Sequence, residues 1–201
     1  MKQEKLKLYQ INMKYIRDLH KKDDNVSSVS PQIGKQHRLY IGIVVICNKR
    51  KYLIPLSHPS EKHLKMSPKA DFDKIYDKKN KIIGVLNYNQ MIPVEMSMIE
   101  LFNINENKND SAAIKHYKQL CKDELTWCRK NEELICNKAN VLYRLCTDEN
   151  SNYKGKNRCL DFKKLERVCD KYAANKPKQT TSSAMYSRRD KDTQIKEHTE
   201  F

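Results

Sequence analysis

The sequence predicts an α+β fold, with a β-rich front half and a helical back half in one folded domain over residues 1–174. Arg38 to Cys47 is almost continuously apolar and β-branched, which is typical of a central strand. From Ser111 onward the apolar residues recur at steps of three, four and seven, which indicates helix. The 201 residues are enough to bury a core and leave room for a second domain only if it is small.

The front half is expected to begin with a strand and a helix. Lys5 to Ile11 alternates polar and apolar residues, which predicts a short strand. Asn12 has a capping side chain and precedes a predicted helix over residues 13–23. The inner face of this helix is expected to carry Tyr15, Ile16 and Leu19. Residues 25–35 are polar and contain Ser, Pro and Gly, so we expect a loop there.

A hairpin is expected next. Asn48 to Arg50 forms the turn after the apolar strand, and Lys51 to Leu56 is the returning strand. A charged segment over residues 69–81 follows the next loop. Its apolar side chains have near-helical spacing and are Phe72, Ile75 and Tyr76. Ile82 to Leu86 and Met91 to Val94 complete this half as two further strands.

The back half is predicted to be helical. Its stripe of apolar residues consists of Ile114, Tyr117, Cys121, Leu125, Cys128, Ile135, Leu142 and Leu145. Ser111 or Asp110 caps this stretch, and its length indicates two helices broken near Asn131 or Asn137. Asp161 caps a last helix, whose apolar face carries Leu165, Val168, Cys169 and Tyr172. Residues 175–201 are polar and aperiodic, so we expect a disordered tail there.

The charge narrows the class of partner. Lys and Arg number 40 against 25 Asp and Glu, which gives a net charge of +15. This excess favours a polyanion, either nucleic acid or an anionic membrane surface, over a merely solvated lysine-rich surface. The N-terminus, MKQEKLKLYQ, lacks the apolar core of a signal peptide, and no run approaches the ~18 apolar residues of a membrane span. We therefore expect a soluble, cytoplasmic protein.

The cysteines do not indicate disulfides or a zinc site. The chain has 7 cysteines, an odd number, and no two of them form a CxxC pair. We expect them to be reduced and to behave mostly as small buried apolar residues.

Groups suited to RNA cleavage gather directly after the returning strand. Ser57, His58, Lys62 and His63 follow it within seven residues. Ser, His and Pro are ordinary turn residues, but loops held by a rigid sheet also often carry active sites. Cleavage through the 2′-hydroxyl of RNA needs a base, an acid for the leaving oxygen, and donors for the developing charge. Histidine titrates near neutrality and suits either proton role.

We expect neither a metal nor another cofactor at this loop. Mg²⁺ is normally held by carboxylates, and the nearest ones, Asp71 and Asp73, lie in a Lys-rich stretch.

Four stretches in the same order resemble the type III toxin–antitoxin endoribonucleases of the ToxN/AbiQ family. LYQINMKYIRDL (residues 8–19) resembles the family's opening strand and helix, and RLYIGIVV (residues 38–45) its apolar strand after a basic residue. KYLIPLSHPSEKH (residues 51–63) resembles the signature that ends in histidine, and GVLNYNQMIPV (residues 84–94) the strand with Met-Ile-Pro. With the helical half, the resemblance covers residues 6–172.

The resemblance implies a fold and an activity. The fold would be a compact, highly curved, barrel-like antiparallel sheet with helices around it. The activity would be metal-independent endonucleolytic cleavage that leaves a 2′,3′-cyclic phosphate and a 5′-hydroxyl. The substrates would be cellular mRNA and the repeats of the chain's own antitoxin RNA. That folded RNA, a pseudoknot, would inhibit the toxin in a basic groove across the active site. A higher-order toxin–RNA assembly, ring or compact dimer, and a role in phage defence by abortive infection are also implied.

The loop departs from the family pattern of hydroxyl-Ser-Pro-Lys. His58 stands at the serine position and Ser60 at the lysine position. Either catalysis is rewired, with His58 as acid or base and charge from Lys62 or Arg38, or this copy is weakened. We favour rewiring, because imidazole transfers protons better than a serine hydroxyl at neutral pH. The resemblance also places Arg38 near the scissile phosphate and Tyr15 in the site, although a core role for Tyr15 is an equal alternative.

The remaining candidates flank the loop and are expected to contact RNA. Those for the RNA backbone are Ser60, His63, Lys65, Lys69, Lys78, Lys79 and Lys81. Those for base stacking are Tyr76 and Tyr88. For His63 we favour a structural role, in which it orients its neighbours or bonds to the backbone. The plain alternative for each lysine is a solvated side chain.

Two other functions remain open. A non-catalytic RNA-binding protein fits the charge and the scattered aromatic residues equally well. A DNA-binding regulator is a third possibility, but the sequence contains no convincing helix-turn-helix.

Overall fold

The computed structural model describes residues 5–27, 41–67 and 69–175. Its strands are β1 (Leu8–Ile11), β2 (Ile41–Cys47), β3 (Arg50–Ser57), β4 (Phe72–Tyr76), β5 (Ile82–Asn87), β6 (Ile92–Pro93) and β7 (Ile99–Leu101). Its α-helices are α1 (Met13–His20), α2 (Glu61–Lys65), α3 (Ala112–Lys130), α4 (Glu132–Thr147) and α5 (Phe162–Ala174). Short 3₁₀ turns are η2 (Tyr88–Gln90), η3 (Met96–Met98) and η4 (Lys156–Arg158). The predicted α+β class is confirmed.

The strands form one seven-stranded antiparallel sheet in the order β4-β5-β3-β2-β1-β7, with β6 paired to β3. The apolar β2 strand lies in the interior of this order, as its composition predicted. Within the described part of the chain the sheet is open, with β4 and β7 at its edges, so the expectation of a barrel-like sheet is wrong. The chain closes no ring because β4 pairs only with β5, and β7 only with β1.

The hairpin between β2 and β3 has a two-residue turn. Cys47 pairs with Arg50, and the two residues between them, Asn48 and Lys49, have φ angles of 48° and 65°. Two successive positive φ angles are the geometry that matches the twist of antiparallel strands, and asparagine adopts it readily. The turn therefore fixes the register of β3, and with it the position at which Ser57 leaves the sheet.

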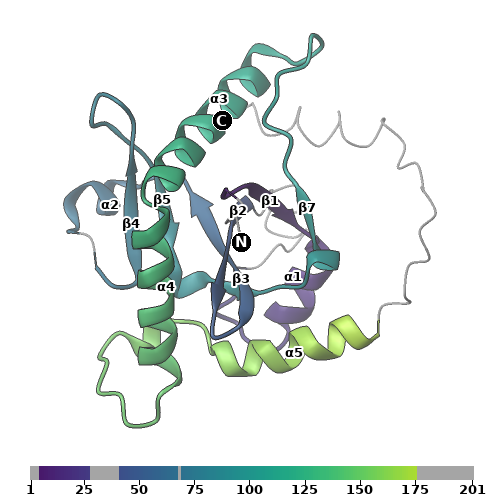
Figure 1. Ribbon diagram of the computed structural model, residues 1–201, viewed down its shortest axis with the longest axis vertical. Coiled ribbons are helices and arrows are strands. Elements are labelled where there is room, and N and C mark those ends of the chain that lie inside the picture. Colours follow the sequence, from purple (N-terminus) through teal and green to yellow (C-terminus); the bar gives the residue numbers. More distant parts are fainter. Residues whose placement is uncertain (1–4, 28–40, 68, 176–201) are drawn as a thin grey trace.

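Three predicted helix caps are confirmed. The side chain of Asn12 accepts from the backbone N–H of Lys14, that of Ser111 from Ile114, and that of Asp161 from Lys164. The long helical stretch breaks at Asn131, one of the two predicted positions. Figure 1 shows α3 and α4 following one another along one side of the sheet, with α5 across its lower end.

The prediction of near-helical spacing over residues 69–81 is wrong, because β4 occupies Phe72 to Tyr76. This strand is buried along most of its length, including Asp73 and Lys74, so its pattern does not alternate. The short helix α2 and the edge strand β7 were not predicted at all. Both are short and lack a periodic apolar stripe, so local sequence carries little signal for them.

A buried carboxylate links the sheet to the last two helices. Glu166 of α5 accepts hydrogen bonds at 2.8 Å from the hydroxyls of Tyr52 on β3 and Tyr143 on α4. The ammonium of Lys163 lies 3.1 Å from its other oxygen. Burial opposes ionisation of this carboxyl, but the three donors outweigh burial and lower the pKa of Glu166. The network fixes α5 against β3.

All seven cysteines are free thiols, and six of them are buried, as expected. None of the described helices is long and apolar enough to cross a membrane.

Candidate active site

The end of β3 positions the first candidate group. Ser57 is the last residue of the strand and pairs with Val85 of β5. The amide nitrogen of Asn87, which ends β5, donates to Ser57 Oγ at 2.8 Å. This bond occupies a lone pair of the hydroxyl, so its hydrogen remains available as a donor. Ser57 is therefore an oriented hydrogen-bond donor at the start of the loop.

A buried lysine stands in the same row of the sheet. Ser57 and Lys74 both pair with Val85, one from each side, so the three side chains share one face. Lys74 is only 7% exposed. Its ammonium donates to the backbone carbonyl of Leu64 at 3.1 Å and, among the described residues, makes no ion pair with a carboxylate. Lys74 thus brings a positive charge from the sheet up to the underside of α2.

Helix α2 is held by a reciprocal contact at its N-terminus. The backbone N–H of Ser60 donates to His63 Nδ1 at 3.0 Å, and Ser60 Oγ lies 2.9 Å from the same nitrogen. The imidazole takes the part that Glu or Gln plays in a capping box. Burial, followed by the charges of Lys62 and Lys74, lowers the pKa of His63. A neutral imidazole with an accepting Nδ1 fits the structural role that we favoured for this residue.

His58 and Lys62 present their functional groups to solvent. His58 lies between the strand end and α2, is exposed, and makes no hydrogen bond within the described residues. Lys62 and Lys65 are exposed on α2. The connection between β3 and α2 therefore carries an imidazole with no hydrogen bond to a described residue (His58), an oriented hydroxyl (Ser57) and exposed lysines. These groups suit proton transfer and stabilisation of an anionic phosphorane-like state.

The structure does not support a place for Tyr15 at this loop. Tyr15 is fully buried on α1, its hydroxyl donates to the carbonyl of Pro93 at 2.8 Å, and its ring contacts Tyr172 at 4.9 Å between centroids. Burial raises the pKa of the phenol, which therefore stays protonated. These surroundings match the core role for Tyr15, which the sequence predicts equally well.

The assignment of Tyr88 to base stacking is corrected. Tyr88 is fully buried, its hydroxyl donates to Asp73 at 2.8 Å, and the ammonium of Lys138 lies over its ring at 5.3 Å. A ring covered in this way has no face free for a base. Sequence reasoning missed this because the partners come from β4 and α4, which are distant along the chain.

The other flanking candidates lie on or near the β4–β5 hairpin. Lys69 is exposed just before β4, and Tyr76 is half-buried at the end of that strand. The exposed lysines of the turn are Lys78, Lys79 and Lys81. The carboxylate of Asp77 accepts from the backbone N–H groups of the last two and fixes the turn. Arg38 lies outside the described residues.

Two residues of this face were not foreseen. Asn87 and Lys74 reach the loop only through strand pairing. Asn87 lies within the stretch GVLNYNQMIPV, but the sequence did not single it out, and Lys74 belongs to none of the four stretches. The polar end of an apolar strand was the available signal for Asn87, and a lysine inside a strand was the signal for Lys74. Among the described residues, no group of three or more His, Cys, Asp or Glu side chains is arranged to hold a metal ion.

Comparison with known proteins identifies the family. The family model described as "Toxin ToxN, type III toxin-antitoxin system" matches residues 7–170. An endoribonuclease ToxN from Bacillus thuringiensis subsp. kurstaki is 30% identical over 171 residues, 83% of this chain and 84% of the relative. An endoribonuclease AbiQ from Lactococcus lactis subsp. lactis is 28% identical over 84% of this chain and 90% of its own.

Solved structures share the fold. One, from work on selective toxin inhibition by a non-coding RNA pseudoknot in type III systems, superposes with a TM-score of 0.71 at 24% identity, over 85% of this chain and 99% of the other. Another, from work on a processed non-coding RNA that regulates a bacterial antiviral system, gives a TM-score of 0.64 at 26% identity, over 80% and 95%. With the family model covering most of its length, the chain belongs to the ToxN family of type III toxin–antitoxin toxins.

Proposed function

We propose that the chain is an endoribonuclease toxin that cleaves RNA at the β3–α2 loop without a metal ion. The observation that carries the proposal is the exposed imidazole of His58, in the loop that begins with the oriented hydroxyl of Ser57 and leads to the exposed cation of Lys62. Two relatives in the same family are named endoribonucleases. Loop residues held by a rigid strand pair are suited to precise positioning of a phosphodiester.

In this proposal the substrate's own 2′-hydroxyl attacks the adjacent phosphorus atom. The 2′ proton leaves to a base, the P–O5′ bond breaks, and the leaving oxygen takes a proton, so the products carry a 2′,3′-cyclic phosphate and a 5′-hydroxyl. His58 performs one of the two proton transfers. Ser57 donates its free hydrogen to a non-bridging phosphate oxygen, and Lys62 offsets the growing negative charge. Arg38 remains a candidate for a second phosphate contact.

We further propose that a folded antitoxin RNA is the physiological inhibitor. One structural neighbour comes from work on toxin inhibition by an RNA pseudoknot, and the net charge of +15 suits a large polyanionic partner. On this basis the protein acts on cellular mRNA and on its own antitoxin repeats in the bacterial cytoplasm, forms a higher-order assembly with that RNA, and serves phage defence. Ser60, Lys65, Lys69, Tyr76 and the lysines of the β4–β5 turn stay candidates for RNA contact.

The test is cleavage of RNA by purified protein in EDTA, with analysis of the ends. We expect products with cyclic phosphate and 5′-hydroxyl ends, and loss of cleavage by at least about a hundredfold in His58→Ala, the range for a general acid or base. His116→Ala is the matched control, because His116 is an exposed histidine on α3. Full activity of His58→Ala would remove His58 from the mechanism, and a strict need for Mg²⁺ would overturn metal independence.

A non-catalytic RNA-binding protein is the second candidate, and the net charge favours it equally. It predicts salt-dependent RNA binding by the wild-type protein with no cleavage of any RNA tested. If the wild type and His116→Ala cleave RNA and His58→Ala does not, the protein is an endoribonuclease and not a non-catalytic RNA-binding protein.

A further inference from the structure

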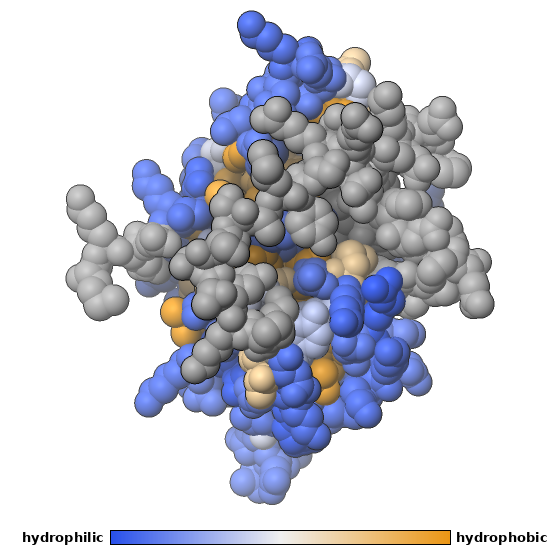
Figure 2. Space-filling model, turned by 90° about the vertical axis from the view of Figure 1, so that its right-hand side faces the viewer, coloured by the Kyte–Doolittle hydropathy of each residue, from blue (hydrophilic) through white to orange (hydrophobic). Residues whose placement is uncertain are grey.

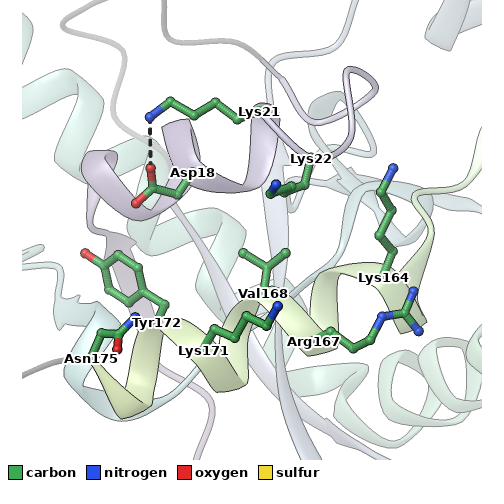
Figure 3. A pocket seen from close by; sticks show the side chains of 9 residues that line it. All are labelled: Asp18, Lys21, Lys22, Lys164, Arg167, Val168, Lys171, Tyr172 and Asn175. Atoms are coloured by element: carbon green, nitrogen blue, oxygen red, sulfur yellow. Dashed lines mark hydrogen bonds and ion pairs between the residues drawn. The ribbon is translucent and has the colours of Figure 1, made fainter.

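A second basic surface lies between α1 and α5. The groove has a volume of about 470 Å³ and is lined by nine residues, which Figure 3 shows as side chains from the two helices and the residues that follow each of them. Five of them are cationic and one is an acid. The cations are Lys21, Lys22, Lys164, Arg167 and Lys171, and the acid is Asp18. We call this surface the α1–α5 groove.

The cations of the groove are arranged in two facing rows. Lys164, Arg167 and Lys171 lie three and four residues apart on α5, so they follow one face of the helix. Lys21 and Lys22 follow the last turn of α1 on the other side. All five side chains are exposed. Positive charge thus lines both walls.

Most of this charge is not neutralised within the described chain. Lys21 lies 3.3 Å from the carboxylate of Asp18, and this exposed pair contributes little. None of the ion pairs between described residues includes the other four cations. Elsewhere on α5, by contrast, Lys163 pairs with Glu166. Figure 2 turns the right-hand side of Figure 1 toward the viewer. In the lower half of this view the described surface is mostly hydrophilic.

The groove also has an apolar floor. Val168 and Tyr172 point between the two helices in Figure 3, and both are half-buried. The ring of Tyr172 packs against the buried Tyr15, which fixes its orientation. A rigid ring beside a double row of cations suits a sugar-phosphate backbone with an accessible base or sugar face.

The groove lies far from the candidate active site. Arg50, the first residue of β3, pairs with Asp170 of α5 at 2.6 Å, whereas Ser57, the last residue of β3, opens the catalytic loop. Seven steps of about 3.3 Å place these ends roughly 23 Å apart. A short single strand centred on the loop does not extend to α5, whereas a folded RNA longer than this distance can contact both.

We propose that the α1–α5 groove binds the sugar-phosphate backbone of the folded antitoxin RNA, as a site separate from the loop that cuts. The proposal rests on the proposed function for the identity of the RNA. It assigns the groove to holding the inhibitor, with no part in the cleavage of short substrates. Both walls of the groove carry positive charge, which matches the row of negative charges along a sugar-phosphate backbone. We therefore assign the groove to an RNA backbone.

The experiment uses two RNA probes and the full chain. The first is a ribo-oligonucleotide of roughly five nucleotides, used for cleavage. The second carries the same nucleotides with 2′-deoxy sugars, which prevents cleavage, joined to a hairpin stem of about twelve base pairs, long enough to exceed the distance to the groove. The groove variant is the double substitution Lys164→Glu and Arg167→Glu. The control is Lys115→Glu with Lys130→Glu, two exposed lysines of α3 with the same change in net charge.

We expect the groove variant to bind the hairpin probe at least about tenfold more weakly, with a salt slope reduced by about two, because two phosphate contacts are lost. Cleavage of the short strand should stay within about twofold of wild type, and the control should change neither quantity by as much. Unchanged hairpin binding, equal loss in the control, or equal loss of short-strand cleavage would each overturn the proposal. If no variant or wild type cleaves RNA, the proposed function fails, while hairpin binding still decides on the groove.

Discussion

At the scale of single residues, Lys74 is a buried positive charge that contacts the helix directly after the candidate catalytic loop. Its ammonium is buried under α2, bonded to the carbonyl of Leu64 and without a carboxylate partner among the described residues. A buried unpaired charge costs stability, so a stabilising role alone does not explain it. We infer a positioning role for Lys74, because its ammonium bonds to the helix that follows His58 and adds positive charge below it.

Replacing Lys74 with Met tests this role. We expect the single-turnover cleavage rate to fall by about tenfold or more, while the urea midpoint stays equal or rises, since an apolar side chain suits the buried position. Lys115→Met on α3 is the control and should change neither quantity. A wild-type rate in Lys74→Met would contradict the positioning role. If both the cleavage rate and the urea midpoint of Lys74→Met are lower than those of the wild type, Lys74 has only a structural role.

Glu124 gives a prediction for pH. Its carboxyl is buried on α3 against Gly84, where any larger residue would collide with it. Burial, followed by the charge of Asp123, raises the pKa of Glu124 to about 8. In the unfolded chain the carboxyl loses its proton near pH 4.5, so between these values the folded state holds a proton that the unfolded state has released. Stability therefore falls as pH rises through this window and levels off above it.

The variant Glu124→Gln removes this titration with little change in shape. Near pH 5 its urea midpoint should be close to that of the wild type, and at pH 8 it should be more stable by about 2 kcal/mol or more. Glu133→Gln, at an exposed position of α4, serves as the control. Parallel pH profiles for wild type and Glu124→Gln would show that the buried carboxyl does not govern this dependence.

At the scale of elements, the contact between Ser60 and His63 raises the question of whether His63 supports α2 or transfers protons. Glutamine at the third helical position can reach back to the N-cap N–H, whereas alanine cannot. We expect His63→Ala to slow cleavage and to lose about 1 kcal/mol of local helix stability, and His63→Gln to restore most of the rate. Equal loss of rate in both variants would assign His63 to the chemistry. The measurement is the cleavage rate at several pH values.

The elements also show what local sequence determines. The caps at Asn12, Ser111 and Asp161 were predictable because each bonds to N–H groups two or three residues away. Strand β4 was not predictable, because the partners that satisfy its buried charges come from other elements. Lys138 of α4 pairs with Asp73, and the carbonyl of Leu64 accepts from Lys74. Local periodicity cannot register contacts of this kind.

The residues of the candidate site also differ in how far the sequence could predict them. The loop from Ser57 to His63 is contiguous, so its grouping was visible in the sequence and is preserved in the structure. The sequence did not determine whether Tyr15 and Tyr88 lie in the core or in the site, since an aromatic residue suits both equally well. Their burial depends on Pro93, Tyr172 and Lys138, which lie tens of residues away.

At the scale of the whole molecule, α5 is the element that completes the fold. It carries Glu166, which binds hydroxyls from β3 and α4, and Asp170, which pairs with Arg50 at the hairpin. Its buried face also contributes Leu165 and Cys169 to the core. The helix ends at Ala174, and the family match ends at residue 170. These contacts make α5 part of the folded domain, and the boundary at residue 174 stays a prediction.

Truncation tests this boundary. A chain that ends at residue 175 keeps every contact that α5 makes with the other described residues. We therefore expect its free energy of unfolding in urea to stay within about 0.5 kcal/mol of the full chain and its cleavage of a short RNA to be unchanged. A chain that ends at residue 161 loses α5 and leaves Tyr52, Tyr143 and Arg50 without their acidic partners. Leaving such buried groups unpaired costs about 3 kcal/mol or more, so this chain should not fold cooperatively. If the chain that ends at residue 175 is measurably less stable than the full chain, residues 176–201 belong to the folded domain.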